Sequence, residues 1–435
     1  MIIHSICAIC LILIYPLCVF ADTTFVNERY ISGVWVAEGS PYVISDDVQY
    51  AIIPQRDTLL IESGVTVLFP QAGGILVDGV LLAEGEAGDS IYFNGYNDVY
   101  WASIEAPTLG ATIIMKYCDV KNAMADPQEY PNGIAIVSRN SIISHCTFTN
   151  CGNGVISDDF DSTIVEYCHF YNTGGAMLEG LFKSVTNCVF VFNGRHSRVS
   201  LDKGLLANCL FISEDAGDII NLDLWTGVIT INNIFIGDTI RLESDSEILT
   251  NNCFYAIYQD IRVPFEGLGV IDRTNPNGDS TDAYGNLFMD PLLAGGDAWP
   301  DRYFLTAESP CIDAGDPEGE LDPDGTIADI GPFYFHQNAV SGSDFILHPS
   351  SLILSVSPNP LNSQGVLKYQ LPKTMKIRIA LYDLSGREMA LVEDGDKTAG
   401  THTIQLDISD APAGLYFARL ETDATSRVVK LVNLK

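Results

Sequence analysis

Two groups of acidic side chains in this sequence have types and spacings that suit chemistry. The first is Asp158, Asp159 and Asp161, which His196 follows later in the chain. Enzymes that hydrolyse glycosidic bonds use a pair of carboxyl groups, one as acid and one to activate water or attack directly. The same three aspartates are more simply read as an acidic turn that only meets solvent. The sequence alone leaves both interpretations open.

The second group lies in an Asp-rich segment that could bind calcium. Five carboxylates fall between residues 313 and 329: Asp313, Asp316, Asp322, Asp324 and Asp329. Carboxylate oxygens on a turn are ligands that Ca²⁺ prefers. The segment departs from an EF-hand loop, because no Glu stands at the twelfth position counted from Asp322. A metal site and a plain closing loop therefore both remain possible.

A short repeat between residues 112 and 256 must position these side chains. Its unit is a cysteine or apolar residue followed two positions later by another apolar residue. The copies are Cys118 and Val120, Cys146 and Phe148, Cys168 and Phe170, Cys188 and Phe190, Cys209 and Phe211, Ile234 and Ile236, and Cys253 and Tyr255. Alternate residues of a strand face the same way, so each copy predicts one short strand. Copies about 20 residues apart predict a solenoid.

These strands predict a parallel β-helix in which each coil pairs with the next. Its cysteines and phenylalanines should stack in files inside the cylinder. Coils about 4.8 Å apart hold neighbouring thiols with parallel Cβ directions, whereas a disulfide needs Cβ atoms about 3.8 Å apart. We therefore expect buried free thiols, with Cys146 and Cys151 as the one pair left open. Asn150, Asn172 and Asn193, which each follow a strand, predict a ladder of turn amides.

The composition is that of a folded and strongly acidic protein. Of 435 residues, 47% are hydrophobic, and the formal net charge is −33. Residues 351–435 hold 10 Lys+Arg and 9 Asp+Glu, so residues 1–350, with 13 and 47, carry the whole acidic excess. Such a body should not bind nucleic acid, because affinity there comes largely from neutralising phosphates. It should also repel uronate polyanions unless a metal is bound. Lys183, Arg198 and Lys203 are too scattered in the sequence to identify any of them as the base of a lyase.

Residues 1–21 predict a secretory signal peptide that is cleaved after Ala21. The apolar run at residues 5–20 has no Lys or Arg before it and is too short for a comfortable membrane span. Removal of this segment takes away three of the 11 cysteines and leaves eight. We expect the chain to be secreted.

Two segments resemble parts of secreted bacterial right-handed β-helix proteins. Residues 64–69, Gly-Val-Thr-Val-Leu-Phe, resemble their entry coils, and residues 309–316, Ser-Pro-Cys-Ile-Asp-Ala-Gly-Asp, resemble their closing segment. The resemblance implies a β-helix over residues 22–335, with residues 303–335 as a cap on the last coils. The Asn-Thr-Asp and Arg-Ile-Lys motifs of the pectin hydrolases that share this fold are absent. Residues 336–350 are the expected linker.

Residues 351–435 change character and predict a small antiparallel β-sandwich, because alternating strands are joined by glycine turns. The ordered motifs of this tail resemble the C-terminal sorting domain of type IX secretion cargo. The residues that carry the resemblance are Pro358, Asn359, Pro360, Asp383, Gly386, Gly414 and Tyr416. It implies export by an outer-membrane secretion machinery to the cell surface or the medium. An accessory sandwich without a sorting role is the alternative.

The sequence therefore predicts an all-β protein, a right-handed parallel β-helix followed by a small antiparallel β-sandwich. We expect a secreted or cell-surface module that binds or has a structural role, with carbohydrate as a possible ligand. Trp225 is the best candidate for an exposed, sugar-stacking ring. The alternative is a carbohydrate-active enzyme, either a glycoside hydrolase or a polysaccharide lyase, on the same β-helix. Calcium is the one cofactor considered.

Overall fold

The computed structural model describes residues 23–337 and 353–433, with gaps at 125–133, 139, 158–161, 194–196, 216, 226, 246–247, 297–298, 372–373, 384–386, 399, 410, 413 and 423–425. The expected signal peptide at residues 1–21 lies outside the described residues, as does most of the expected linker at residues 336–350. Within the described residues the secondary structure is β-strand and a few 3-10 turns, without an α-helix.

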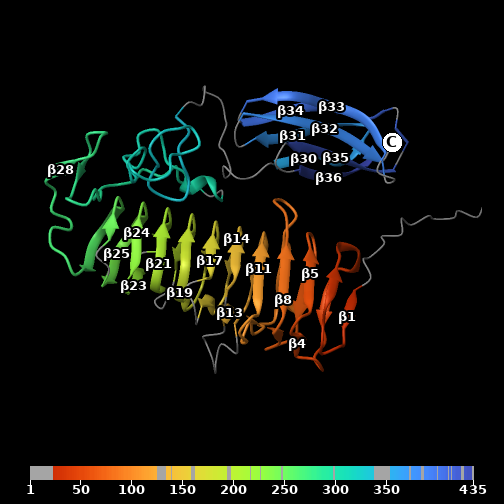
Figure 1. Ribbon diagram of the computed structural model, residues 1–435, viewed down its shortest axis with the longest axis horizontal. Coiled ribbons are helices and arrows are strands. Elements are labelled where there is room, and N and C mark those ends of the chain that lie inside the picture. Colours follow the sequence, from red (N-terminus) through yellow and green to blue (C-terminus); the bar gives the residue numbers. More distant parts are fainter. Residues whose placement is uncertain are drawn as a thin grey trace, which may run out of the picture.

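The first part of the chain is a parallel β-helix whose coils place strands on three faces (Figure 1). We name the faces A, B and C. Face A holds β1 (Thr24–Val26), β3 (Tyr42–Ile44), β6 (Thr66–Phe69), β9 (Ile91–Gly95), β12 (Cys118–Lys121), β15 (Thr147–Thr149), β18 (His169–Tyr171), β20 (Val189–Phe192), β22 (Leu210–Ser213) and the first halves of β25 (Ile234–Ser244) and β27 (Cys253–Arg262).

Faces B and C complete each coil. Face B holds β2 (Gly33–Trp35), β5 (Thr58–Glu62), β8 (Val80–Glu84), β11 (Thr112–Lys116), β14 (Ile142–Ser144), β17 (Ile164–Glu166), the second halves of β19 (Ala176–Thr186) and β21 (Arg198–Ala207), β24 (Val228–Ile231) and β26 (Leu249–Thr250). Face C holds β4 (Tyr50–Ile53), β7 (Gly74–Val77), β10 (Ile104–Glu105), β13 (Ile134–Ser138), β16 (Asn153–Ser157), β23 (Ile219–Leu224) and the remaining halves of the long strands.

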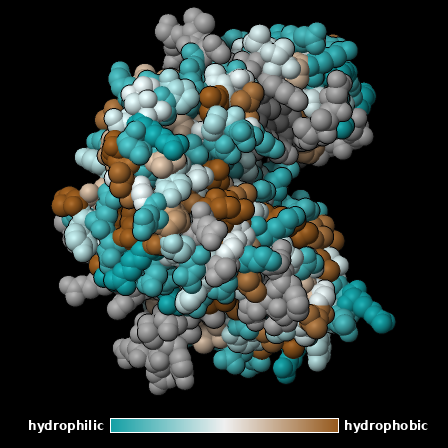
Figure 2. All heavy atoms as spheres, turned by 60° about the vertical axis from the view of Figure 1, so that its left-hand side comes forward, coloured by the Kyte–Doolittle hydropathy of each residue, from teal (hydrophilic) through white to brown (hydrophobic). Residues whose placement is uncertain are grey.

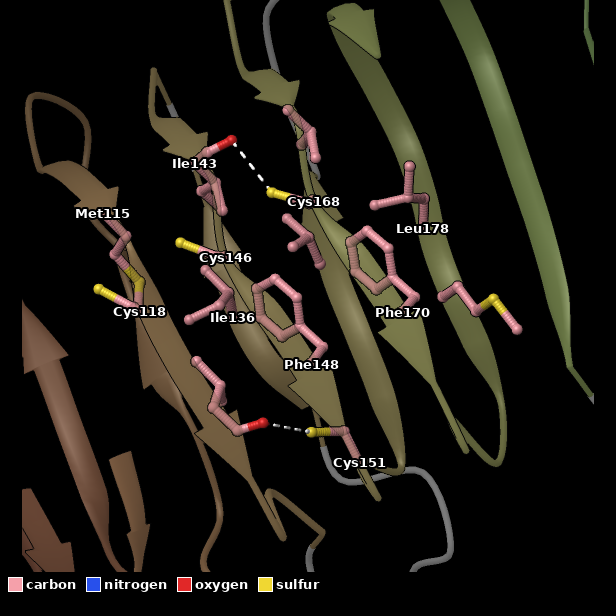
Figure 3. Packing of buried hydrophobic residues seen from close by; sticks show 14 of the residues in the cluster. Met115, Cys118, Ile136, Ile143, Cys146, Phe148, Cys151, Cys168, Phe170 and Leu178 are labelled. Carbon is pink, nitrogen blue, oxygen red and sulfur yellow. Dashed lines mark hydrogen bonds between the residues drawn. The ribbon is translucent and has the colours of Figure 1, made fainter. Parts of the chain in front are cut away.

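A file of stacked phenylalanines fills the cylinder. Phe148, Phe170, Phe190, Phe211, Phe235 and Phe254 are fully buried, and neighbouring ring centroids are 4.8 to 5.0 Å apart. The spacing equals the distance between strands of paired coils, so each ring rests on the ring of the next coil. Figure 3 shows two of these rings beside the thiols. The expected aromatic file is confirmed.

The thiol file is confirmed in its first five members and corrected in the last two. Cys118, Cys146, Cys168, Cys188 and Cys209 are free, buried and stacked, and each thiol lies near main-chain carbonyls. Cys209 faces Asn233, and Asn233 faces Asn252, so amides continue the file. Ile234 and Cys253 point outward instead. The alignment of these two coils by sequence is one residue out of register. Such a shift moves the apolar side chains of a strand from one face of the sheet to the other.

The outward-pointing apolar residues of the late coils have a cover. Val189, Leu210, Ile234 and Cys253 belong to a buried cluster with Leu287, Tyr303, Leu305, Cys311 and Ile330 from the segment after the last coil. The expected cap therefore packs on the lateral side of face A, and the cylinder's end is met by Phe288, which stacks on Phe254. Cys146 and Cys151, the pair left open by the sequence, are both free. Figure 3 shows them apart.

Turn residues are stacked as the sequence suggests, over a partly different set. The side-chain amides of Asn122, Asn150 and Asn172 each donate to the asparagine of the preceding coil, starting from Asn94. All three donors have φ between 53° and 58°, the left-handed conformation that asparagine tolerates. A second corner holds Tyr117, His145 and Tyr167 as a ring stack.

The tail forms a separate and mainly antiparallel unit, with one parallel strand pair. Its strands are β30 (Ile353–Asn362), β31 (Gln364–Leu371), β32 (Met375–Asp383), β33 (Glu388–Lys397), β34 (Gly400–Asp407), β35 (Gly414–Thr422) and β36 (Ser426–Asn433), in the order β33-β32-β35-β36-β30-β31-β34. They enclose their own apolar core, which includes Leu367, Tyr369, Ile379 and Leu420. The remaining elements are the hairpin β28 (Arg273–Thr274) with β29 (Ser280–Thr281) and the turns η1 (Ala37–Gly39), η2 (Tyr96–Asp98) and η3 (Asp301–Tyr303).

Candidate functional site

The predicted catalytic group lies outside the described part of the chain. Residues 158–161 and 194–196 are among the gaps, so Asp158, Asp159, Asp161 and His196 have no position to compare. The catalytic interpretation of these residues stays a prediction.

The Asp-rich segment brings four of its five carboxylates together. Asp329 is 3% exposed and accepts a hydrogen bond from the main-chain N–H of Asp313 at 2.7 Å and another from that of Phe335. Asp322 accepts one from the N–H of Asp329 at 2.9 Å. Asp324 accepts from Thr326 and from the N–H of Gln337. These bonds close the loop on itself.

Asp316, the fifth carboxylate, turns away from this group. Its main-chain N–H donates to Asn232 at 2.9 Å, and its carboxylate accepts from the N–H of Glu318. Within the described residues, no set of three or more His, Cys, Asp or Glu side chains is arranged to hold a metal ion. Main-chain N–H groups satisfy much of the carboxylates' bonding capacity, and calcium at this loop stays a prediction.

Burial changes the protonation of two of these carboxyl groups. Burial, with a contribution from Asp322 and Asp313, raises the pKa of Asp329 from 3.8 to about 8, against the effect of its two N–H donors. Burial, with Asp324 and Asp313 nearby, raises the pKa of Asp322 to about 6. Both groups line a small cavity of about 70 Å³ between the loop and the corner residues Tyr167, Asn187 and Asn208. Both carboxyl groups therefore keep their protons at pH values at which an exposed carboxyl group has lost them.

The pH dependence of stability follows from these two pKa values. Between pH 4 and pH 8 the folded chain holds protons that the unfolded chain has lost, so the free energy of unfolding decreases as pH rises through that window. The contribution of these two protonated carboxyl groups to the free energy of unfolding is fully present below about pH 4 and is lost above about pH 8. We expect the melting temperature, measured by differential scanning calorimetry, to fall from pH 5 to pH 8.5, and to fall less in Asp329→Asn. Asp316→Asn is the matched control, and equal pH slopes in both variants would contradict the assignment.

A second candidate site lies on face A where the cap ends. One file of outward residues runs Tyr92, Asp119, Thr147, His169, Val189 and then Leu210 along successive coils. The file changes from polar to apolar after His169. The apolar members are those buried under the cap, so the change in residue type marks the edge of the covered region.

Trp299 stands at this edge as an exposed aromatic platform. Its ring stacks on His169, with the centroids 3.8 Å apart and the planes 10° from parallel, yet 47% of its surface is exposed. The edges of Tyr303 and Phe333 contact it from the sides, at 5.6 and 6.4 Å between centroids. Burial, and then the charge of Arg302, lower the pKa of His169 to about 3, so the imidazole under the indole is neutral.

Polar side chains surround the platform. Glu214 accepts a hydrogen bond from the Tyr303 hydroxyl at 2.8 Å and pairs with Arg302 at 3.1 Å. On the uncovered side, Asp119, Lys121, Thr147, Thr149 and Tyr171 form what we call the floor. Tyr171 is 40% exposed, and its ring lies 6.1 Å from His169. The floor and Trp299 together make a ledge of hydroxyl, charged and aromatic groups.

Trp225 is exposed as predicted, at 54%, whereas Trp35 and Trp101 belong to the core. Sequence reasoning did not single out Trp299, because it lies in an irregular Gly-rich and Asp-rich segment without a strand pattern. The change from Thr147 and His169 to Val189 and Leu210 in the outward file is the signal that could have located the edge of the cap.

The described sorting residues lie within or at the ends of strands in the tail. Pro358, Asn359 and Pro360 lie in β30, Asp383 ends β32 and pairs with Tyr416, and Gly414 begins β35. Tyr416 is buried, and its hydroxyl donates to the carbonyl of Pro412 at 2.8 Å. Gly386 lies outside the described residues. Pro358, Asn359 and Pro360 thus coincide with the interruption in the pairing of β30 with β31, between Ser357 and Asn362, and Tyr416 closes the turn before β35.

Fold and tail define the class of protein, a right-handed parallel β-helix carrying a separate C-terminal β-sandwich. Residues 355–434 match the family model of the secretion system C-terminal sorting domain. The tail is thus a type IX sorting domain, which interacts with that secretion machinery, and the protein is secreted to the extracellular space or the cell surface. No curated protein and no solved structure matches the chain. None of the described segments is a helix long and apolar enough to cross a membrane.

Proposed function

We propose that the β-helix is a binding module that holds an uncharged polysaccharide on the ledge formed by the floor and Trp299. The observation that carries the proposal is the exposed Trp299 ring, held flat on His169 and braced by Tyr303. A ring fixed in this way presents a rigid apolar surface with little entropy to lose on binding. The apolar C–H face of a sugar ring is its natural partner.

The floor supports the same kind of ligand. Thr147, Thr149 and Tyr171 offer hydroxyl groups in successive coils, and Lys121 and Asp119 add one charge of each sign. Hydroxyl and amide groups placed beside an apolar platform give a binding site its specificity. The excess of carboxylates in residues 1–350 disfavours polyanions, which leaves an uncharged glycan as the class that fits.

The domain division is part of the proposal. A signal peptide at residues 1–21, a β-helix over 22–335 closed by the segment 303–335, a linker at 336–350 and a sorting domain at 351–435 fit the export route that the tail defines. The lateral packing of Leu305, Cys311 and Ile330 on face A supports a role for the closing segment in the β-helix.

Replacing Trp299 tests the function. In Trp299→Ala we expect the affinity for the best glycan of an array of uncharged polysaccharides to fall about tenfold. Full burial of a large apolar side chain contributes roughly 1.5–3 kcal/mol, so covering the exposed half of the indole should contribute about half of that. A loss of about 1.4 kcal/mol lowers an affinity tenfold. The full-length protein and its variants would be compared by isothermal titration calorimetry.

Trp225→Ala provides the matched control, since Trp225 is similarly exposed but lies between β23 and β24, away from the floor. Its affinity should equal that of the unmodified protein. Binding that survives Trp299→Ala, or an array without any bound uncharged glycan, would remove the proposal.

A further inference from the structure

Large apolar side chains reach the surface in several places, and Figure 2 shows brown apolar patches between teal polar ones. One ordered set lies on face B, where the same position of successive strands is apolar. We call it the aliphatic stripe: Leu60, Leu82, Ile114, Ile142, Ile164, Leu205, Ile229 and Ile248, one residue per coil, interrupted by Ser184. All eight are at least partly exposed, and Ile142, Ile229 and Ile248 are 40%, 39% and 43% exposed.

The strands of face B have the composition of a sheet covered on both sides. Their inward residues, such as Leu81, Ile113 and Ile143, are fully buried, and the outward neighbours that form the stripe are aliphatic too. Parallel strands with continuous apolar runs are typical of sheets buried on both faces. Exposed apolar patches of this extent mark interaction sites.

The stripe lies between two flanks that differ chemically, and one of these flanks forms a groove. Beside it runs an open groove of about 480 Å³ lined by Thr112, Ile114, Asn140, Ile142, Ser162, Ile164 and Lys183. This flank, at the N-terminal ends of the strands, carries hydroxyl and amide groups. The flank at the C-terminal ends carries Glu62, Glu84, Lys116 and Glu166. The two flanks therefore differ in charge and in length of side chain.

We propose that face B is the interface of a homodimer, in which the aliphatic stripes of two copies pack along a two-fold axis parallel to the β-helix axis. This axis reverses the strand direction, so the carboxylate flank of one copy faces the hydroxyl flank of the other. Glu166 of the second copy then meets Ser162 and approaches Lys183. The alternative two-fold axis, along the strands, would place Glu166 opposite itself, and like charges in contact are destabilising.

The area of the stripe is sufficient for a stable dimer. Nine coils at a spacing of about 4.8 Å give a length of about 38 Å, and five residues at about 3.3 Å each give a width of about 16 Å. The product is about 600 Å² per copy, and both copies together exceed the roughly 1,000 Å² that a specific interface needs. An aliphatic, aromatic-free stripe suits a protein surface, since homodimer interfaces are the most apolar class.

The oligomeric state of the full-length protein tests the proposal. We expect light scattering coupled to size exclusion to give twice the chain mass at micromolar concentration, more completely at 0.5 M salt, because salt screens the repulsion between two acidic bodies. Ile142→Glu should give the monomer mass. Ile257→Glu, at a position 88% exposed on β27, is the matched control and should remain dimeric. A monomeric unmodified protein, or a dimer that persists in Ile142→Glu, would overturn the proposal.

Cysteine cross-linking tests the axis and does not depend on a variant that disrupts assembly. In the proposed dimer each stripe residue faces the same residue of the other chain. Ile114→Cys and Ile229→Cys should therefore each form a disulfide-linked dimer when oxidised glutathione is added. The native cysteines of the β-helix are buried and should stay reduced under these conditions. Linkage of Ile164→Cys alone would show the other two-fold axis and refute this arrangement.

Discussion

Replacing Phe190 with alanine is expected to lower the free energy of unfolding by about 3–5 kcal/mol. Phe190 is fully buried at the middle of the aromatic file, with its ring centroid 5.0 Å from that of Phe170 and 4.8 Å from that of Phe211. The change removes a buried ring and leaves a cavity. The cavity cannot collapse, because strand pairing fixes the spacing of the coils on both sides. Equilibrium unfolding in urea, followed by tryptophan fluorescence, measures the effect.

Phe25→Ala is the control for this experiment. Phe25 lies on the first strand of the same face but is 59% exposed, so the same chemical change there should cost little. Similar losses in the two variants would mean that the aromatic file does not hold the coils together. A loss below about 1 kcal/mol in Phe190→Ala would contradict the packing in the same way, because it is less than a buried phenylalanine normally contributes.

Deleting residues 351–435 is expected to abolish export almost completely. These residues include the sorting domain at 355–434, through which the type IX machinery engages its cargo. In a host with that machinery the full chain should reach the cell surface or the medium, and the shortened chain should accumulate in the periplasm. Immunoblots of the fractions, with protease treatment of intact cells, measure the change.

Two point variants show whether the folded tail is what the machinery needs. Tyr416→Ala removes a buried ring whose hydroxyl closes the turn at Pro412, and should lower export strongly. Leu391→Ala changes a side chain that is 52% exposed on β33 and should leave export unchanged. Equal surface display of the full and shortened chains would show that the tail has no sorting role in this protein.

The first five coils of the cysteine repeat were readable from the sequence, whereas the last two were not. From Cys118 to Cys209, residues two apart are the inward pair in each coil, so pattern and structure coincide. At Ile234 and Cys253 the apolar residues face the cap, and Asn233 and Asn252 point inward and bond to each other. A strand covered on both faces shows no alternation, and its register must come from its neighbours.

The candidate sites, too, were predictable from the sequence only in part. The sequence located the Asp-rich loop, since its carboxylates are close along the chain, but not which of them converge: Asp316 bonds with Asn232 and Glu318, apart from Asp329. Trp225 was recognisable as exposed from its polar neighbours. The position of Trp299 on His169 was not, because the two residues belong to segments far apart in the sequence.

The strand period, the coil repeat, the separate tail and its sorting motifs can all be read from the sequence. These features depend on alternation and spacing over a few residues, which the backbone converts directly into strands and turns. Only the folded structure shows where the closing segment lies, that Asp322 and Asp329 are the carboxyl groups with raised pKa values, and that the ring of Trp299 stays exposed. Those outcomes depend on contacts between distant segments, whose geometry is set only when the coils have stacked and the cap has packed on face A.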